Sequence, residues 1–228
     1  MKRGISILAV VTALLLSLAL YEALIGAPTE RTMGDVQRIF YYHVPSAWTA
    51  FLLFLINFIA SIVYLIRRNP KTDILALVSA EVGVVFCTVV IVTGPIWARP
   101  VWGIWWAAGD IRLTTTLVLW LIYISYLVLR RFSTSGQTPV IAAVLAIFGA
   151  LDVPLVYFSI WFFRTQHPSP VIGGGGSLDP RMAHVLLINW AAFLCLAWLV
   201  SWTRYRLEVV KREVEEAQAL ESLLEGSR

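Results

Sequence analysis

Six long runs of apolar residues follow one another along this 228-residue chain, and they limit what it can fold into. A helix needs roughly 20 apolar residues to cross the hydrocarbon core of a bilayer, and each run is about that long. With 59% hydrophobic and 14% charged residues and a mean hydropathy of +0.77, the chain has too little polar surface to coat a soluble globule. We therefore expect an all-α membrane protein with six transmembrane helices, in residues 5–25, 46–66, 74–93, 113–130, 139–162 and 182–202.

Charged residues give this topology a direction. The formal net charge is +4, but the basic residues come in twos and threes between the apolar runs, so we expect topology signals and no nucleic-acid binding. Those on the side of the two termini are Lys2, Arg3, Arg67, Arg68, Lys71, Arg130, Arg131, Arg204, Arg206, Lys211 and Arg212, and those on the other side are Arg31, Arg38, Arg99, Arg112, Arg164 and Arg181. Because short loops rich in Lys and Arg stay in the cytoplasm, both termini are predicted to be cytoplasmic. In a bacterium, the three remaining loops then face the periplasm.

The two ends of the chain carry separate predictions. The first apolar run is longer than the apolar part of a usual signal peptide, contains Tyr21 and Glu22, and lacks a clear cleavage site, so we expect a retained helix. Residues 204–228 are charged, with apolar residues at near-helical spacing. This pattern predicts a cytoplasmic amphipathic helix that follows a six-helix domain of residues 1–203. Docking on a partner subunit and binding to the membrane surface both remain open for this tail.

Three carboxylates lie within the apolar runs, where a charge costs about 2.5–3.5 kcal/mol on insertion scales. Glu22 is close to the outer end of the first run and is expected at the interface. Glu81 is expected to pair with Lys71, with Arg67 or with a partner subunit. These pairings would offset the cost of its burial.

The fifth apolar run holds Asp152 two residues before Pro154. The proline frees a backbone carbonyl group and can bend the helix. We expect a structural hydrogen bond at Asp152 in preference to a role in proton transfer. Asn57 and Asn189, in the second and sixth runs, are expected to form hydrogen bonds between helices.

All three histidines fall in the outer half of this topology. His43 precedes the second span, His167 follows the fifth, and His184 is near the start of the sixth. Imidazole is a common neutral ligand of haem iron and transition metals, and two imidazoles on opposing helix ends can bind one iron from both faces. On placement alone, an ordinary structural role for the histidines would still be favoured.

The second outer loop is rich in tryptophan. The four residues are Trp97, Trp102, Trp105 and Trp106. An aromatic belt at the membrane interface would explain scattered tryptophans, but here they surround Gly103, Gly109 and the pair Asp110 and Arg112. Flat indole rings can stack on a planar macrocycle, Arg112 can pair with anionic propionates, and Asp110 can orient that arginine or a ligand. These features together match the needs of a porphyrin.

Three segments in this order resemble the CcmC proteins (haem exporter protein C) of cytochrome c maturation, within a superfamily marked by a tryptophan-rich "WWD" loop. Residues 38–48, RIFYYHVPSAW, are similar to the family's entry to its second helix. Residues 93–114 are similar to its tryptophan-rich loop, and residues 154–167 to its fifth helix with the histidine after it. The resemblance covers most of the chain.

The resemblance implies a role for several residues. His43 and His167 match the family's two functional histidines, which implies that they are axial ligands of haem iron or close haem contacts. Arg38 and Arg112 match its conserved basic positions. The implied ligand is haem b, bound as cargo rather than as a resident cofactor.

Two positions depart from the family pattern or lie outside it. His184 matches neither functional histidine, and we expect it to be an ordinary residue near a helix start. The family loop usually has a further tryptophan directly before its aspartate, whereas Gly109 precedes Asp110 here. We expect the stacking geometry of the loop to differ accordingly.

The resemblance also implies a function: a haem-handling subunit in the bacterial inner membrane that binds haem at the periplasmic face and delivers it to the haem chaperone CcmE. The implied partners are the ABC-transporter subunits CcmA and CcmB and the small membrane subunit CcmD. The sequence has no nucleotide-binding G-x-x-x-x-G-K-[ST] motif, so an ATP-driven step would come from another chain, and we do not expect an enzyme. The alternatives are a cytochrome c haem lyase of the same superfamily and a membrane subunit whose tryptophans form only an interfacial belt.

Overall fold

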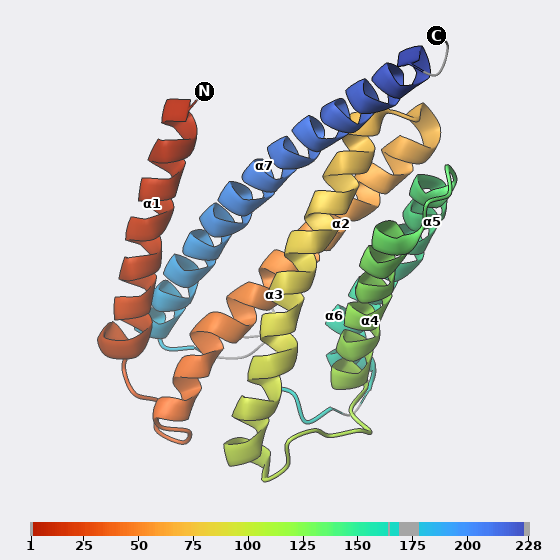
Figure 1. Cartoon of the computed structure of the whole chain (residues 1–228). Helices are drawn as coiled ribbons and strands as arrows, with labels where there is room; N and C mark the ends of the chain where they lie inside the picture. The colour runs from red at the N-terminus through yellow and green to blue at the C-terminus, as the bar shows by residue number, and fades with distance from the viewer. Residues whose placement is uncertain (1, 164, 169–177, 226–228) are drawn as a thin grey trace.

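A computed structural model of the chain describes residues 2–163, 165–168 and 178–225. Among these residues, six helical segments are long and apolar enough to cross a membrane, which confirms the predicted fold class. Both termini lie at one end of the bundle, and the loop after α3 lies at the other (Figure 1). The elements are α1 (Lys2–Tyr21), the π-helical turn η1 (Glu22–Gly26), the 3-10 turn η2 (Asp35–Ile39), α2 (Phe40–Arg67), α3 (Pro70–Trp102), α4 (Ile111–Phe132), α5 (Thr138–Ala150), α6 (Asp152–Phe162) and α7 (Pro180–Glu225).

The centre of the bundle is the pair α2 and α3, against which α4, α5 and α7 pack, whereas α1 packs mainly on α7 at one edge (Figure 1). In the core, Phe54 of α2 stacks on Tyr123 of α4 with ring centroids 3.8 Å apart. Beside this pair, Asn57 Nδ2 donates to the carbonyl oxygen of Ala76 at 2.7 Å, and its Oδ1 accepts from the Tyr123 hydroxyl at 3.4 Å. Asn57 therefore joins three helices, as predicted.

The predicted role of Asn189 is also confirmed. Its Nδ2 is 2.9 Å from the carbonyl oxygen of Val185 in its own helix and 3.3 Å from that of Ala19 in α1. The side chain is fully buried. This polar contact helps to fix α1, whose other face is apolar and exposed, against α7.

The fifth span consists of two helices, because α5 ends at Ala150 and α6 begins at Asp152. Pro154 has no N–H to donate to the carbonyl group of Ala150, so the helix is interrupted where the sequence predicts a bend. The hydrogen bond expected at Asp152 does not form at Oδ2, which is buried without a partner among the described residues.

The sixth span continues without a break into the tail. Helix α7 has 46 residues and is about 69 Å long at 1.5 Å per residue, more than twice what a span needs. The predicted helix in the tail is present, and it begins as an extension of the span rather than after a loop. From position 213 to 225 its residues are exposed on all sides. This last part of α7 therefore extends from the bundle along the axis of the sixth span.

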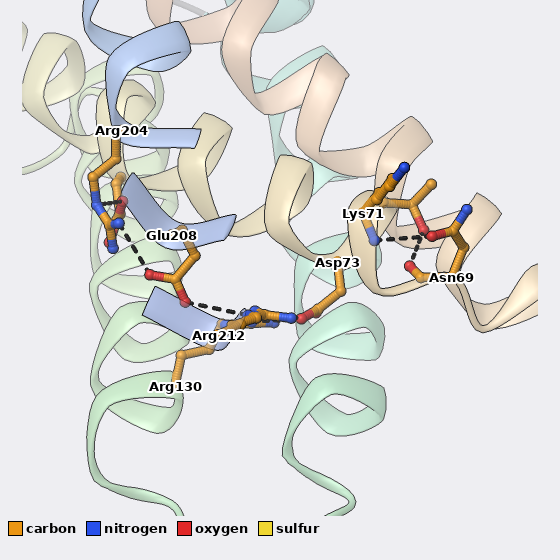
Figure 2. A network of polar contacts seen from close by, with 9 residues as sticks. Asn69, Lys71, Asp73, Arg130, Arg204, Glu208 and Arg212 are labelled. Carbon is orange, nitrogen blue, oxygen red and sulfur yellow. Dashed lines mark hydrogen bonds and ion pairs between the residues drawn. The ribbon is translucent and has the colours of Figure 1, made fainter. Parts of the chain in front are cut away.

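A network of ion pairs joins the tail to α3 and α4 at the end of the bundle that holds the termini (Figure 2). Asp73, in the first turn of α3 and 2% exposed, binds Arg130 of α4 through two contacts, one of them 2.9 Å. Arg212 of α7 lies 2.8 Å from the same carboxylate and 3.3 Å from Glu208. Each buried carboxylate therefore has a guanidinium partner, which offsets the cost of removing its charge from water.

The partner of Glu81 differs from the prediction. Arg204 of α7 lies 2.8 Å from one oxygen of Glu81 and 3.0 Å from the other, so the carboxylate pairs with the tail and not with Lys71 or Arg67. Arg204 also contacts Glu208 at 3.0 Å. The pairing was missed because the partners are 123 positions apart in the chain, and only the continuation of α7 brings them together.

Candidate functional site

A cavity of about 480 Å³ opens at the end of the bundle opposite the termini, between α2, α3, α4 and α6. Its volume lies in the range of roughly 300–1,000 Å³ that is usual for small-molecule sites. Apolar residues such as Phe51 and Val90 contribute to its lining. Among the residues predicted from the sequence, the structure places six on its wall: His43, His167, Trp97, Trp102, Trp106 and Arg112.

His43 lies in the first turn of α2 and is 8% exposed. Its Nδ1 is 2.9 Å from the hydroxyl oxygen of Thr93 in α3. The edge of Trp97 packs against its ring, with centroids 5.8 Å apart. The ring therefore contacts two residues on one face of α3, a helical turn apart, and it lines the cavity.

His167 comes from the segment after α6 and lies across the cavity from His43. The centroids of the two imidazole rings are 6.5 Å apart, and the ring planes differ by 33°. His167 Nδ1 donates to the carbonyl oxygen of Pro168 at 3.0 Å. Burial, with the nearby charge of Arg112, lowers the pKa of His167 to about 4, so the ring is neutral at neutral pH. Neutral imidazole is the form that binds metal ions.

Asp110 does not line this cavity but holds two of its loops together. Its Oδ1 accepts from the backbone N–H groups of Arg112 at 3.0 Å and Leu113 at 3.2 Å, which caps the N-terminus of α4. Its Oδ2 accepts from the Thr165 hydroxyl and from the N–H of Gln166, the latter at 2.7 Å. Burial alone would raise the pKa of Asp110, but these hydrogen bonds lower it below its usual range. The carboxylate is therefore ionised at neutral pH and links the tryptophan-rich loop to the His167 segment.

Thr165 carries this link to His167. Its hydroxyl oxygen, which donates to Asp110, accepts from the backbone N–H of His167 at 3.1 Å. Thr165 lies in the motif of residues 154–167, and no role was predicted for it. A hydrogen bond across 55 positions leaves no signal in local sequence, so Asp110 was expected to orient a ligand or an arginine instead.

Arg112 supplies the positive charge of the cavity. Its Nη1 is buried and has no hydrogen-bond partner within the described part of the chain. Buried guanidinium groups are normally hydrogen-bonded, so Arg112 Nη1 is a donor that a ligand in the cavity could satisfy. The indole N–H of Trp97, on the same cavity wall, is also buried without a partner among the described residues.

Three other residues lie away from the cavity. Trp105 is 60% exposed in the loop after α3. Arg38 donates to the carbonyl oxygen of Ala23 at 2.9 Å and pairs with Asp35 at 3.1 Å, so it fastens the end of the first span to the start of the second. His184 lies near the start of α7, as expected, and is exposed.

Known proteins match this chain along nearly all of its length. The family model described as heme exporter protein C (CcmC) matches residues 1–220. The chain belongs to this family. A heme exporter protein C from Bradyrhizobium diazoefficiens is 34% identical over 218 residues, which cover 94% of this chain and 82% of the relative. The resemblance inferred from the motifs is thereby confirmed.

More distant members of the heme exporter protein C family are similar over comparable lengths. The Escherichia coli protein of the same name is 28% identical over 203 residues, covering 89% of this chain and 82% of the relative. A "putative cytochrome c biosynthesis ccmC-like mitochondrial protein" from Marchantia polymorpha is 31% identical over 183 residues, covering 80% of this chain and 78% of the relative. The names of these relatives refer to haem export and to cytochrome c biosynthesis.

Proposed function

We propose that this chain is the haem-binding and haem-transfer subunit of a cytochrome c maturation system. The observation that carries the proposal is the cavity in which two imidazoles and a guanidinium with an unpaired nitrogen face one space. Membership of the heme exporter protein C family supports haem as the molecule that is handled. Haem b is the cargo, and the role is transfer rather than catalysis.

His43 and His167 are the proposed axial ligands of the haem iron. Metal–imidazole bonds are about 2 Å long, so two rings that share one metal ion have their centres about 6 Å apart. The separation of 6.5 Å is close to this value. The spacing therefore supports an iron held between the rings, with the porphyrin plane crossing the space between them.

The cavity wall supports the porphyrin as well as the iron. Trp97, Trp102 and Trp106 provide flat apolar surface for the macrocycle. Arg112 Nη1 is the proposed partner of a propionate, because a charge-assisted hydrogen bond would satisfy the unpaired buried donor. Trp105 is exposed and Arg38 binds the carbonyl oxygen of Ala23, so we propose no direct haem contact for them.

The distribution of basic residues supports a site on the periplasmic face of the bacterial inner membrane, since the termini and their basic residues mark the cytoplasmic side. Delivery of haem to the chaperone CcmE, and association with CcmA, CcmB and CcmD, belong to this proposal. ATP hydrolysis is assigned to another subunit, because the sequence lacks the phosphate-binding motif.

Haem transfer tests the proposal in cells that contain the whole system. The chain is replaced by the His43→Ala/His167→Ala variant, and the haem bound covalently to the chaperone is measured after denaturing electrophoresis. We expect haem-loaded chaperone with the wild-type chain and with the matched control His184→Ala, and a loss of more than tenfold with the double variant. Equal loading of the chaperone in all three strains would contradict the proposal.

A further inference from the structure

The hydroxyl group of Thr93 contacts the ring of His43 at a point where the single hydroxyl proton already has a partner. Thr93 Oγ1 is 2.6 Å from the carbonyl oxygen of Val89 in its own helix and 2.9 Å from His43 Nδ1. A carbonyl oxygen only accepts, so the hydroxyl donates its proton to Val89. The second contact is then a hydrogen bond that the Thr93 oxygen accepts, and its donor is an N–H at Nδ1 of His43.

We infer that Thr93 is a positioning residue that holds His43 in the Nδ1–H tautomer and thereby leaves the lone pair at Nε2 for a metal ion. A neutral imidazole carries one N–H, so protonation of Nδ1 makes Nε2 the acceptor. Histidines that bind metals commonly donate their other ring N–H to a fixed acceptor, which sets the ring orientation and makes the ligand more basic. That Nε2 binds iron rests on the proposed function, whereas the tautomer does not.

The surroundings of the ring support this role. Gly94, next to Thr93, also lies beside the ring: a Cβ built there would be 3.5 Å from Cε1 of His43, an ordinary van der Waals distance. On the opposite side of the cavity, His167 donates from its own Nδ1 to the carbonyl oxygen of Pro168. Both rings that line the cavity thus have Nε2 as their acceptor nitrogen. Of the two acceptors that fix them, only the Thr93 hydroxyl can be removed by a side-chain substitution.

The tautomer is measured first, in the full chain without haem. The chain has three histidines, so ¹⁵N-labelled histidine gives few signals, and His43→Ala identifies those of His43. We expect a protonated Nδ1 and an unprotonated Nε2 at His43 in the wild type and in Thr93→Ser, which keeps the hydroxyl. Thr93→Val has a similar shape without the hydroxyl and should show a mixture of tautomers. A wild-type His43 protonated at Nε2, or a Thr93→Val chain with the wild-type pattern, would overturn the inference.

Haem binding is measured second, with ferric haem added to the same purified chains. Loss of such a supporting hydrogen bond typically weakens a metal site by about 10–100-fold, and we expect haem to dissociate from Thr93→Val at least about tenfold faster. The midpoint potential should rise, because a less basic ligand stabilises ferric iron less, and the high-spin fraction should increase. Thr93→Ser should retain the wild-type values. Thr93→Ala serves as a second variant without the hydroxyl if valine prevents folding.

Two results would distinguish a wrong role for Thr93 from a wrong proposed function. If Thr93→Ser loses haem as fast as Thr93→Val does, the hydroxyl is not the cause, and the role assigned to Thr93 is wrong. If the wild-type chain shows no haem spectrum that depends on His43, the proposed function fails instead, and the tautomer measurement decides the inference about Thr93.

Discussion

Arg112 carries an unsatisfied donor, since its Nη1 is buried without a partner in the described structure. A charge-assisted hydrogen bond contributes about 1.5–3 kcal/mol. If a haem propionate is the partner, Arg112→Gln should weaken haem retention by about 10–150-fold and leave the thermal midpoint of the haem-free chain unchanged or higher. Haem dissociation in detergent measures the first quantity, with the exposed Arg181→Gln as matched control. Retention at the wild-type level would remove the propionate role.

Asp110 holds its surroundings through the hydrogen bonds that its carboxylate accepts. In Asp110→Asn, the amide can still accept at the start of α4, but the NH₂ group that replaces Oδ2 cannot accept from Thr165 and Gln166. Leaving such buried donors unpaired costs about 1–3 kcal/mol each. We expect a lower thermal midpoint and a haem spectrum with a larger high-spin fraction, because the His167 segment loses its attachment.

A useful comparison for Asp110 is Thr165→Val, which removes one of the same hydrogen bonds from the other side. The double variant should add little to either single change, since both act on one contact. Additive effects of the two substitutions on the thermal midpoint would show that Asp110 and Thr165 act separately.

The residue scale shows what local sequence can and cannot predict. His43, His167 and three of the four loop tryptophans line the cavity, and they could be selected from the sequence because rare residue types recur in three ordered motifs. Asp110 was expected to orient Arg112 or a ligand, and Arg38 was singled out as a conserved basic position of the family, whereas in the structure each connects one segment to another. These connections are hydrogen bonds to segments distant in the sequence or to backbone atoms. A sequence motif does not reveal either kind of partner.

Among the helices, the ion pairs between α3, α4 and α7 lead to a prediction about the stability of the chain. Asp73 is 2% exposed, and the Arg130 side chain beside it is 8% exposed. Removing one partner of a buried pair typically costs about 3–5 kcal/mol. Because Arg212 still contacts Asp73, we expect Arg130→Ala to fall at the lower end of that range and to lower the thermal midpoint by several degrees.

The control for Arg130→Ala is Arg181→Ala, which breaks the exposed pair with Asp179. Exposed pairs contribute about 0–1 kcal/mol, so this variant should melt close to the wild type. Equal midpoints for the two variants would show that the buried network contributes no more than a surface pair.

The spans themselves were predictable, because burial in lipid requires long apolar runs and leaves few alternatives. Pro154 likewise indicated the bend between α5 and α6. The uninterrupted α7 and its pairing with Glu81 were not predicted, because charged residues after an apolar run are compatible with a loop, a surface helix or a continuous helix. Only the contacts of Arg204 and Arg212 with α3 distinguish these cases.

In the whole molecule, the proposed function requires that the cavity and the tail face opposite sides of the membrane. Single cysteines at Gly109 and at Ser222, in a chain whose Cys87 and Cys195 are replaced, can be labelled with a maleimide that does not cross membranes. We expect labelling of the Gly109 position in cells with a permeable outer membrane, and of the Ser222 position only after the inner membrane is opened. The reverse pattern would place the cavity in the cytoplasm.

Axial ligation of haem iron by His43 and His167 is tested by the absorbance spectrum of the purified full chain with added haem. His43→Ala, His167→Ala and the exposed control His184→Ala are compared with the wild type. We predict a low-spin, six-coordinate spectrum in the wild type and the control, and a high-spin or lost spectrum in each of the other variants. Identical haem spectra in all four chains would contradict axial ligation by His43 and His167.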